Sequence, residues 1–257
     1  MKQTALITGA SSGLGLELAK IFAREGYNLV LVSRSGDKLR ILKKELESAY
    51  GIQAQVFAKD LAEKDAALDV FHFTAEHRIE IQVLVNDAGF GDFGDFLTCH
   101  WEKQYAMVQV NIVALMQLTQ CYLKQMVERG EGRILNLASV AAFQPGPLMS
   151  VYYATKAFVL SFTEALSVEL KSSGVSVMAL CPGPTKTEFE VNADLGHSGL
   201  FKNLKTASAR KVALYGYRQL MKDRIVAVPG MRNKLMVFAS KISPRKVVRA
   251  TVYRIQR

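Results

Sequence analysis

Short apolar runs alternate with longer stretches of helical periodicity along most of this sequence. The apolar runs occupy Thr4–Thr8, Asn28–Ser33, 53–58, 81–85, 133–138 and Val175–Leu180. Their shortness and their lack of polar alternation are typical of strands that are buried on both faces of a parallel sheet. The pattern therefore predicts an α/β fold.

Between these runs, apolar residues recur with the spacing of amphipathic helices. The first predicted helix begins at Leu16, and the second covers 38–49. A third begins near Glu63, and the last two cover 101–128 and 151–171. Polar or small residues follow each predicted strand, at the carboxyl edge of the sheet. Open α/β sheets bind their ligands at that edge, so we expect the functional site there.

The composition is that of a folded protein with a large core. At 257 residues and 49% hydrophobic content, the chain can bury a full core, and we expect a single domain over residues 1–257. No apolar run approaches the roughly 18 residues of a membrane span, and the first one is too short for a signal peptide. Cys99, Cys121 and Cys181 are widely spaced, which favours reduced thiols, no bound metal and a cytoplasmic location.

The positive charge is concentrated in the last part of the chain. The net charge is +10, and residues 201–257 hold 15 Lys and Arg against a single acid, Asp223. Residues 231–257 mix apolar and basic residues, which is typical of helices lying on anionic membrane surfaces. A solvated basic helical extension that caps the core is the alternative. Nucleic-acid binding would suit the charge, but no nucleic-acid motif accompanies it, and we do not expect it.

A glycine-rich loop follows the first predicted strand and opens the first predicted helix. Such a loop presents backbone N–H groups and the positive end of a helix to a phosphate. Gly9 would turn the chain, Gly13 would let the backbone approach a pyrophosphate, and Gly15 would let helix and strand pack closely. The spacing differs from the common G-x-G-x-x-G pattern, and a purely structural turn is the alternative.

The end of the second predicted strand indicates which dinucleotide the chain prefers. In dinucleotide-binding folds an acid at this point binds the ribose 2′-OH, whereas an arginine accommodates a 2′-phosphate. Ser33 and Arg34 stand here, and no acid occurs before Asp37. The residues predict a preference for NADPH over NADH, with a solvated surface arginine as the alternative.

Ser139, Tyr152 and Lys156 form the candidate reaction centre. Tyr152 and Lys156 are four residues apart, so on a helix they lie on one face. A phenol transfers protons poorly at neutral pH unless a nearby positive charge lowers its pKa, which Lys156 would do. Tyr152 would then act as a general acid or base, and Ser139 would donate a hydrogen bond to a substrate carbonyl oxygen. A chance Tyr–Lys spacing is the alternative.

Two further polar residues have open interpretations. Asp60 follows the third predicted strand and either belongs to the ligand-binding edge or caps the helix expected near Glu63. Asn111 lies inside a predicted helix, where asparagine is a mediocre residue, so it is either buried for a purpose or a surface residue.

Taken in order, these motifs resemble those of one family. T-G-A-S-S-G-L-G begins at Thr8, N-D-A-G at Asn86 and Y-x-x-x-K at Tyr152, with the Asp60, Asn111, Ser139 and Pro182 positions between and after them. Over residues 3–190 the chain resembles the classical short-chain dehydrogenases/reductases. The resemblance implies a Rossmann-type, doubly wound, seven-stranded parallel sheet with helices on both faces, its last strand near 224–228. It also implies an NADP(H)-dependent oxidoreductase that acts on a ketone, an aldehyde or an alcohol.

The resemblance also assigns roles. It implies that Ser139 polarises the carbonyl, Tyr152 gives it a proton, Lys156 binds the nicotinamide ribose and lowers the tyrosine pKa, and Asn111 helps to hold a water. The implied cofactor contacts are Gly9, Ser11, Ser12, Gly13, Leu14, Gly15, Ser33, Arg34, Asp60, Leu61, Asn86, Ala88, Gly89, Tyr152, Lys156, Pro182, Gly183, Thr185 and Thr187.

Two positions depart from the pattern. Asp87 stands where the family usually has asparagine, and Ser12 lacks the basic residue that some NADP-preferring members have.

Family likeness further implies a substrate lid over about 187–205 and a homodimer or homotetramer. The apolar side chains of that lid favour a lipophilic small-molecule substrate. The alternative function is a sensor or scaffold that binds NADPH without turnover, although such a protein has no need for Ser139 and Asn111.

Overall fold

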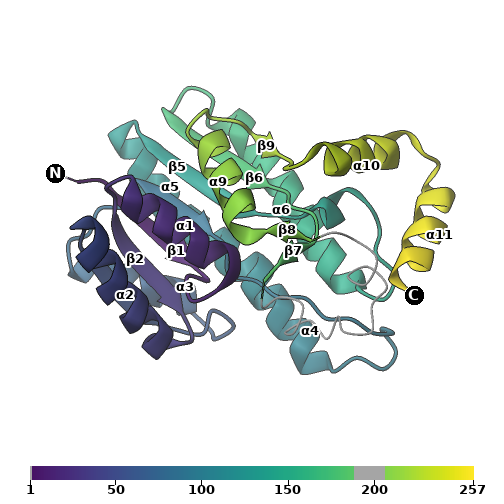
Figure 1. The fold of residues 1–257 in the computed structure, drawn as a ribbon, viewed down its shortest axis with the longest axis horizontal. Helices are drawn as coiled ribbons and strands as arrows, with labels where there is room; N and C mark the ends of the chain where they lie inside the picture. Colours follow the sequence, from purple (N-terminus) through teal and green to yellow (C-terminus); the bar gives the residue numbers. More distant parts are fainter. Residues whose placement is uncertain (1, 188–205) are drawn as a thin grey trace.

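The computed structural model describes residues 2–187 and 206–257 and shows a parallel sheet between two helical layers (Figure 1). The sheet order is β3-β2-β1-β4-β5-β6-β9, and every neighbouring pair is parallel. Its strands are β1 (Thr4–Thr8), β2 (Asn28–Ser33), β3 (Ala54–Ala58), β4 (Val83–Asn86), β5 (Gly132–Leu137), β6 (Val175–Leu180) and β9 (Val226–Ala227). The predicted seven-stranded, doubly wound parallel sheet is confirmed.

The chain order reverses between β1 and β4. From β1 the chain proceeds outward through β2 and β3, then crosses back to β4, which pairs with the other side of β1. In an open parallel sheet, loops separate at such a reversal and leave a crevice at the carboxyl edge. A short parallel pair, β7 (Thr185–Lys186) and β8 (Ala207–Ser208), lies beyond β6.

Helices cover both faces of the sheet, as the apolar strands require. Side chains alternate along each strand: Ala5 and Ile7 of β1 join one core cluster, whereas Leu6 joins the other. The first cluster includes α1 (Gly13–Arg24), α2 (Gly36–Tyr50) and α9 (Ala209–Leu220). The second includes α3 (Ala66–Glu76) and α5 (Leu115–Arg129). Burial on both faces explains why the strand sequences lack polar alternation.

The helix expected over 101–128 has three parts. α4 (Trp101–Val108) leads into a π-helical segment, η1 (Gln109–Ala114), and then into α5. By length and composition alone, the whole run 101–129 is apolar enough to cross a membrane, contrary to the expectation from the sequence. Core helices pass the same test, and Leu118, Tyr122 and Met126 of this run lie in the core.

Several predicted element boundaries differ from the structure by two or three residues. The helix expected from Leu16 begins at Gly13. The helix expected near Glu63 begins at Ala66, directly after Asp65, whose left-handed conformation (φ 59°) is not helical. The strand expected over 81–85 is β4, which begins two residues later.

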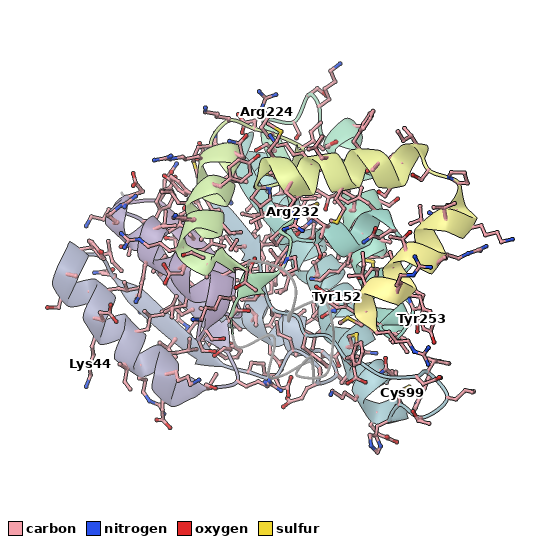
Figure 2. All side chains as sticks on the ribbon, turned by 45° about the vertical axis from the view of Figure 1, so that its right-hand side comes forward. Lys44, Cys99, Tyr152, Arg224, Arg232 and Tyr253 are labelled. Atoms are coloured by element: carbon pink, nitrogen blue, oxygen red, sulfur yellow. The ribbon has the colours of Figure 1, made fainter. Side chains whose placement is uncertain are left out.

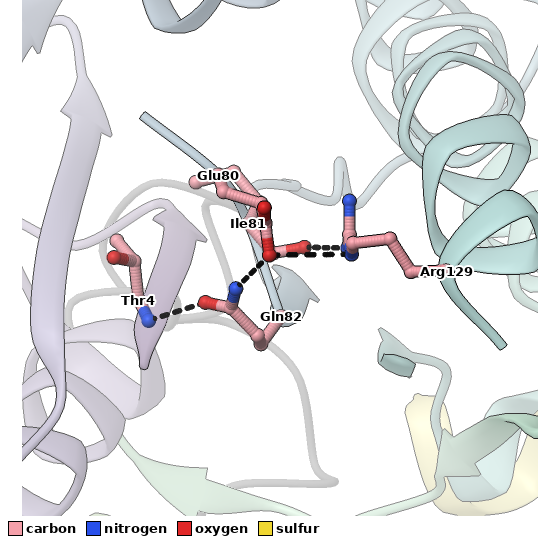
Figure 3. A network of polar contacts seen from close by, with 5 residues as sticks. All are labelled: Thr4, Glu80, Ile81, Gln82 and Arg129. Atoms are coloured by element: carbon pink, nitrogen blue, oxygen red, sulfur yellow. Dashed lines mark hydrogen bonds and ion pairs between the residues drawn. The ribbon is translucent and has the colours of Figure 1, made fainter. Parts of the chain in front are cut away.

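A polar network ties the amino edge of the sheet together (Figure 3). Gln82 Oε1 accepts a hydrogen bond from the Thr4 backbone N–H at 2.7 Å, and Gln82 Nε2 donates to Glu80 at 2.5 Å. Arg129 of α5 donates to the Ile81 carbonyl at 2.7 Å and forms an ion pair with Glu80 at 3.3 Å. The network joins β1, the start of β4 and the end of α5.

At the carboxyl edge lie η2 (Val140–Phe143), the start of α6 (Ser150–Glu169) and the last two helices, α10 (Met231–Ile242) and α11 (Arg245–Gln256). The rest of α6, a helix of 20 residues, packs against β6. α10 and α11 lie to one side of the sheet, in yellow at the right of Figure 1. Val248 and Val252 of α11 pack against Met149 and Tyr153, and buried Gln256 donates a hydrogen bond to the Tyr153 hydroxyl at 2.9 Å. The basic extension is therefore helical and is joined to α6.

Candidate active site

A crevice of about 500 Å³ opens at the carboxyl edge of the sheet, beside the reversal of strand order. Most residues that the sequence assigned to the site line it. They are Gly9, Ser11, Ser12, Gly13, Leu14, Ser33, Arg34, Asp60, Leu61, Ala88, Gly89, Ser139, Tyr152, Lys156, Pro182, Gly183, Thr185 and Thr187. Gly15, Asn86 and Asn111 lie behind this lining, and residues 188–205 of the expected lid lie outside the described chain.

The glycine loop is shaped to bring backbone N–H groups into the crevice. Gly9 has φ +71°, which disfavours any residue with a side chain, and a Cβ at Gly15 would lie 2.4 Å from the Gly9 carbonyl oxygen. The first turn of α1 follows, and Ser12 forms no side-chain cap there. The Gly15 N–H donates to Asp87, and the N-terminal turn of α1 before it has no side-chain cap, so it can face an anion such as a pyrophosphate.

The end of β2 presents positive charge to the crevice. Arg34 is exposed, and Lys38, one helical turn further along, also lines the crevice. The Asp37 carboxylate forms an ion pair with Arg40 at 2.6 Å. Lys59, from the end of β3, is paired with Glu63 and Asp69. The donor set suits a phosphate monoester rather than a ribose hydroxyl.

Asp60 stabilises a turn rather than a helix. Its carboxylate accepts a hydrogen bond from the Ala62 backbone N–H at 3.0 Å, and α3 begins only at Ala66. The helix-capping alternative is therefore wrong for Asp60, and the turn places Asp60 and Leu61 along the crevice.

The three residues of the candidate reaction centre converge. Ser139 follows β5 and caps η2, its hydroxyl accepting a hydrogen bond from the Ala141 N–H at 3.1 Å. Tyr152 and Lys156 lie on one face of α6, with Lys156 Nζ 5.8 Å from the centre of the phenol ring. Ser139 also hydrogen-bonds the Tyr152 hydroxyl. Tyr152 packs against the cluster that contains Val248 and Val252 of α11, and Figure 2 labels it near this helix.

The pKa of Tyr152 differs from the expectation. Burial raises it above the usual value of a phenol, and the hydrogen bond with Ser139 opposes this rise. The nearby Tyr153 adds to the rise, and the lowering expected from Lys156 is not among the main effects on this pKa. Tyr152 is consequently protonated at neutral pH, which is the state of a proton donor.

A buried carboxylate faces Lys156 across the crevice floor. Burial lowers the pKa of Lys156 to about 8, and the Asp87 carboxylate opposes this. Burial likewise raises the pKa of Asp87 to about 7, opposed by the Lys156 charge and by a hydrogen bond from the Gly15 N–H. Lys156 also donates to the Leu137 carbonyl at 2.7 Å. Among the described residues, Asp87 Oδ1 has no hydrogen-bond partner although it is buried.

Asn111 is buried and holds the crevice wall. It is 1% exposed, donates to the Phe90 carbonyl at 2.9 Å and to Thr155 Oγ1 at 3.0 Å, and accepts from the Phe90 N–H. A Cβ at Gly89 would lie 2.9 Å from Asn111 Oδ1 and 3.6 Å from Lys156 Nζ. The surface alternative for Asn111 is wrong, because the π-helical turn directs its side chain inward.

Asn86 joins the elements beneath the site. Its amide donates to Thr119 Oγ1 at 3.1 Å and to Asn136 Oδ1 at 2.9 Å, and Asn136 continues to Thr163. Thr8 Oγ1 accepts the backbone N–H groups of residues 87 and 88. These hydrogen bonds hold the N-D-A-G turn against β1, β5 and α5.

Several lining residues escaped the sequence analysis. Lys38, Gln144, Met149, Tyr153 and Met236 all line the crevice. Lys38 was detectable from its spacing of four after Arg34. Asp87, which the sequence analysis noted as a departure from the family pattern, also lines the crevice. No sequence motif marks Met236 as a crevice residue, because only the tertiary fold brings α10 to the crevice.

Residues 3–196 match the family profile described as short chain dehydrogenase. The chain belongs to the short-chain dehydrogenase family. Its relatives in this oxidoreductase family include hydroxysteroid dehydrogenases and 3-oxoacyl-CoA reductases.

Two curated relatives and one solved structure illustrate the relationship within the short-chain dehydrogenase family. A 17-beta-hydroxysteroid dehydrogenase type 3 of Mus musculus is 38% identical over 187 residues, covering 71% of this chain and 60% of the relative. A very-long-chain 3-oxoacyl-CoA reductase-A of Danio rerio is 33% identical over 189 residues, covering 69% of this chain and 56% of the relative. This chain thus matches little more than half the length of both relatives. A short-chain dehydrogenase from Sphingobium yanoikuyae in complex with NADPH superposes with a TM-score of 0.84, at 31% identity and 93% coverage of each chain.

Proposed function

We propose that this short-chain dehydrogenase is an NADPH-dependent reductase that converts a ketone or aldehyde carbonyl to an alcohol. The observation that carries the proposal is the convergence of Ser139, Tyr152 and Lys156 in a crevice that begins at the glycine loop. In the sheet, Arg34 follows β2 and Ser139 follows β5, with β1 and β4 between them. A crevice that extends across the ends of these four strands suits an extended dinucleotide.

The charge at the end of β2 supports NADPH over NADH. Arg34 is exposed and Lys38 lies one turn away, so a 2′-phosphate would meet two cations there. Asp37, the first acid after β2, is paired with Arg40 and does not line the crevice. The glycine loop and the open first turn of α1 would hold the pyrophosphate.

The chemistry follows from the protonation states of the site. When bound, the cofactor supplies a hydride to the carbonyl carbon. Tyr152 is protonated at neutral pH and gives its proton to the carbonyl oxygen, while Ser139 donates a hydrogen bond to the same oxygen as charge develops. Lys156 is held near the phenol and favours the phenolate that remains after the transfer.

The lining of the crevice supports an apolar substrate. Its apolar lining includes Phe90, Val140, Ala141, Met149, Tyr153 and Met236, and three of these, Ala141, Met149 and Tyr153, pack with Tyr152. The named activities of the relatives, on hydroxysteroids and on very-long-chain 3-oxoacyl-CoA, share a carbonyl attached to a large apolar body. We therefore propose a bulky, lipophilic ketone as the substrate class. A homodimer or homotetramer and a cytoplasmic location stay predictions.

The test is a panel of carbonyl substrates followed by NADPH absorbance with the full chain. A rigid polycyclic ketone, a long-chain 3-oxoacyl thioester and a small water-soluble ketone would each be offered with NADPH and with NADH. The expected result is turnover with NADPH that increases with the apolar surface of the ketone. Binding of NADPH with no oxidation across the panel would instead support a sensor or scaffold.

A further inference from the structure

One face of α10 is apolar and exposed. Met231, Leu235, Phe238 and Ile242 are 70%, 62%, 62% and 68% exposed, and their spacing of four, three and four places them on a single side of the helix. We call these four residues the α10 stripe. Large apolar side chains rarely gather on a solvated helix face without a partner.

The opposite side of α10 is fixed to the body of the enzyme, so the stripe cannot turn inward. Asn233 donates a hydrogen bond to the Pro229 carbonyl at 2.7 Å, and a Cβ at Gly183 would lie 2.6 Å from Asn233 Oδ1. Val237 is buried, and Met236 lines the active-site crevice.

Basic side chains border the α10 stripe. Arg232 lies on one side of it and Lys234 lies on the other, as the helical spacing dictates. Lys241 follows Lys234 on that side, and its Nζ lies 5.3 Å from the centre of the Phe143 ring. Residues 231–257 contain eight Lys and Arg and no Asp or Glu. None of these eight forms an ion pair within the described residues. Figure 2 shows Arg232 at the beginning of α10.

We propose that α10 docks this enzyme on an anionic lipid bilayer, with the α10 stripe in the interfacial layer and the bordering Lys and Arg at the lipid phosphates. An apolar face with cations along both borders matches a membrane interface, where acyl chains lie beneath negatively charged headgroups. A helix of 12 residues is only about 18 Å long, so α10 lies in the interface and does not span it.

The charge argues against a second copy of the chain on this face. In a twofold dimer the same surface meets itself, so the cations around one α10 stripe would approach those around the other. No acid from residues 231–257 is present to compensate them. An anionic lipid surface offers the opposite charge over the whole face.

The test is co-sedimentation of the full chain with phosphatidylcholine vesicles, made with or without phosphatidylglycerol. One variant carries Leu235→Ser and Phe238→Ser, which shortens the stripe and leaves every charge in place. A second carries Arg232→Glu and Lys234→Glu. The matched control is Ile41→Ser on α2, which replaces an equally exposed apolar side chain far along the chain from α10.

Wild type and the Ile41→Ser control are expected to bind the anionic vesicles, and to bind neutral ones about tenfold more weakly. Each double variant is expected to lose about tenfold or more in affinity for anionic vesicles. All four proteins should melt at similar temperatures, since the changed side chains are exposed.

Three results would overturn the proposal: no binding of wild type to either vesicle, equal binding to both, or wild-type binding by the stripe variant. A stripe variant that instead loses self-association in light scattering without vesicles would assign this face to contacts between copies.

Discussion

The two edges of the central sheet both carry polar networks, and these networks are built in opposite ways. At the amino edge, Gln82 and Arg129 form hydrogen bonds and an ion pair with their neighbours (Figure 3). Arg129 Nε is buried and makes no hydrogen bond within the part of the chain that the structure describes, but it lies 3.3 Å from the Glu80 carboxylate. At the carboxyl edge, burial displaces the pKa values of Asp87, Tyr152 and Lys156, and Asp87 Oδ1 lacks a partner among the described residues.

This difference separates a network that stabilises the fold from one that is prepared for chemistry. Partly exposed, paired groups contribute modestly to stability. Buried groups with displaced pKa values cost stability and are concentrated where protons or charges move. The comparison predicts that substitutions at the two edges will have separable effects.

The largest effect on the reaction is expected for Tyr152→Phe. The change removes the hydroxyl that gives the proton and keeps the ring that fills the site. Turnover with NADPH should fall about 10²- to 10⁴-fold. NADPH binding, measured by fluorescence titration, should stay measurable. Turnover close to that of wild type would refute the role of Tyr152.

A smaller effect is expected for Arg34→Asp, which replaces the cation at the end of β2 with the acid that binds a ribose hydroxyl. The ratio of kcat/KM for NADPH to that for NADH should fall about 10- to 100-fold. Arg40→Asp is the control, since Arg40 lies on the exposed side of α2 and pairs with Asp37. An unchanged ratio in the Arg34 variant would count against a 2′-phosphate contact.

A pH-dependent effect of several-fold is expected for Asp87→Asn. Because the pKa of Asp87 is raised to about 7, its carboxyl is neutral below that pH and negative above it. In wild type, the Kd for the anionic NADPH should rise about three- to tenfold from about pH 6 to pH 7.5.

In the Asp87→Asn variant, log Kd for NADPH should change over this pH range by less than about half as much as in wild type. The substitution should also lower the pKa of Lys156, since the carboxylate that raises that pKa is gone. The same pH dependence in wild type and variant would show that Asp87 does not titrate in this range.

The smallest effect on the reaction is expected for Arg129→Met at the amino edge. The Ile81 carbonyl would lose its donor and Glu80 its ion-pair partner, at a cost of about 1–2 kcal/mol in the free energy of unfolding. Urea titration measures this loss, whereas kcat/KM should match wild type. Lys20→Met, which breaks an exposed pair with Glu45, should change neither quantity by much.

The sequence predicted the sheet well, because buried parallel strands are short, uniformly apolar and separated by loops with clear turn residues. Strands β1, β2 and β6 match their predicted limits. The helix expected near Glu63 was misplaced because the left-handed Asp65 has no sequence signal comparable to a glycine.

The site was predictable where it depends on one loop or one helix. The glycine loop and the Tyr152–Lys156 pair each occupy one continuous segment. Asn111 was ambiguous, since the π-helical turn that buries it is not encoded by a recognisable pattern. The raised pKa of Tyr152 could not be foreseen, because it depends on how completely the surrounding elements exclude water.

The π-helical segment from Gln109 to Ala114 also limits how this enzyme can be redesigned. A π turn contains one residue more than the α-helical turn it replaces. Deleting that residue would make the helix regular, but it would rotate α4 against α5 by about 100° and move Asn111 away from Phe90 and Thr155. Efforts to raise thermal stability by making helices regular should therefore leave these six residues unchanged, because their π-helical geometry places Asn111 against Phe90 and Thr155.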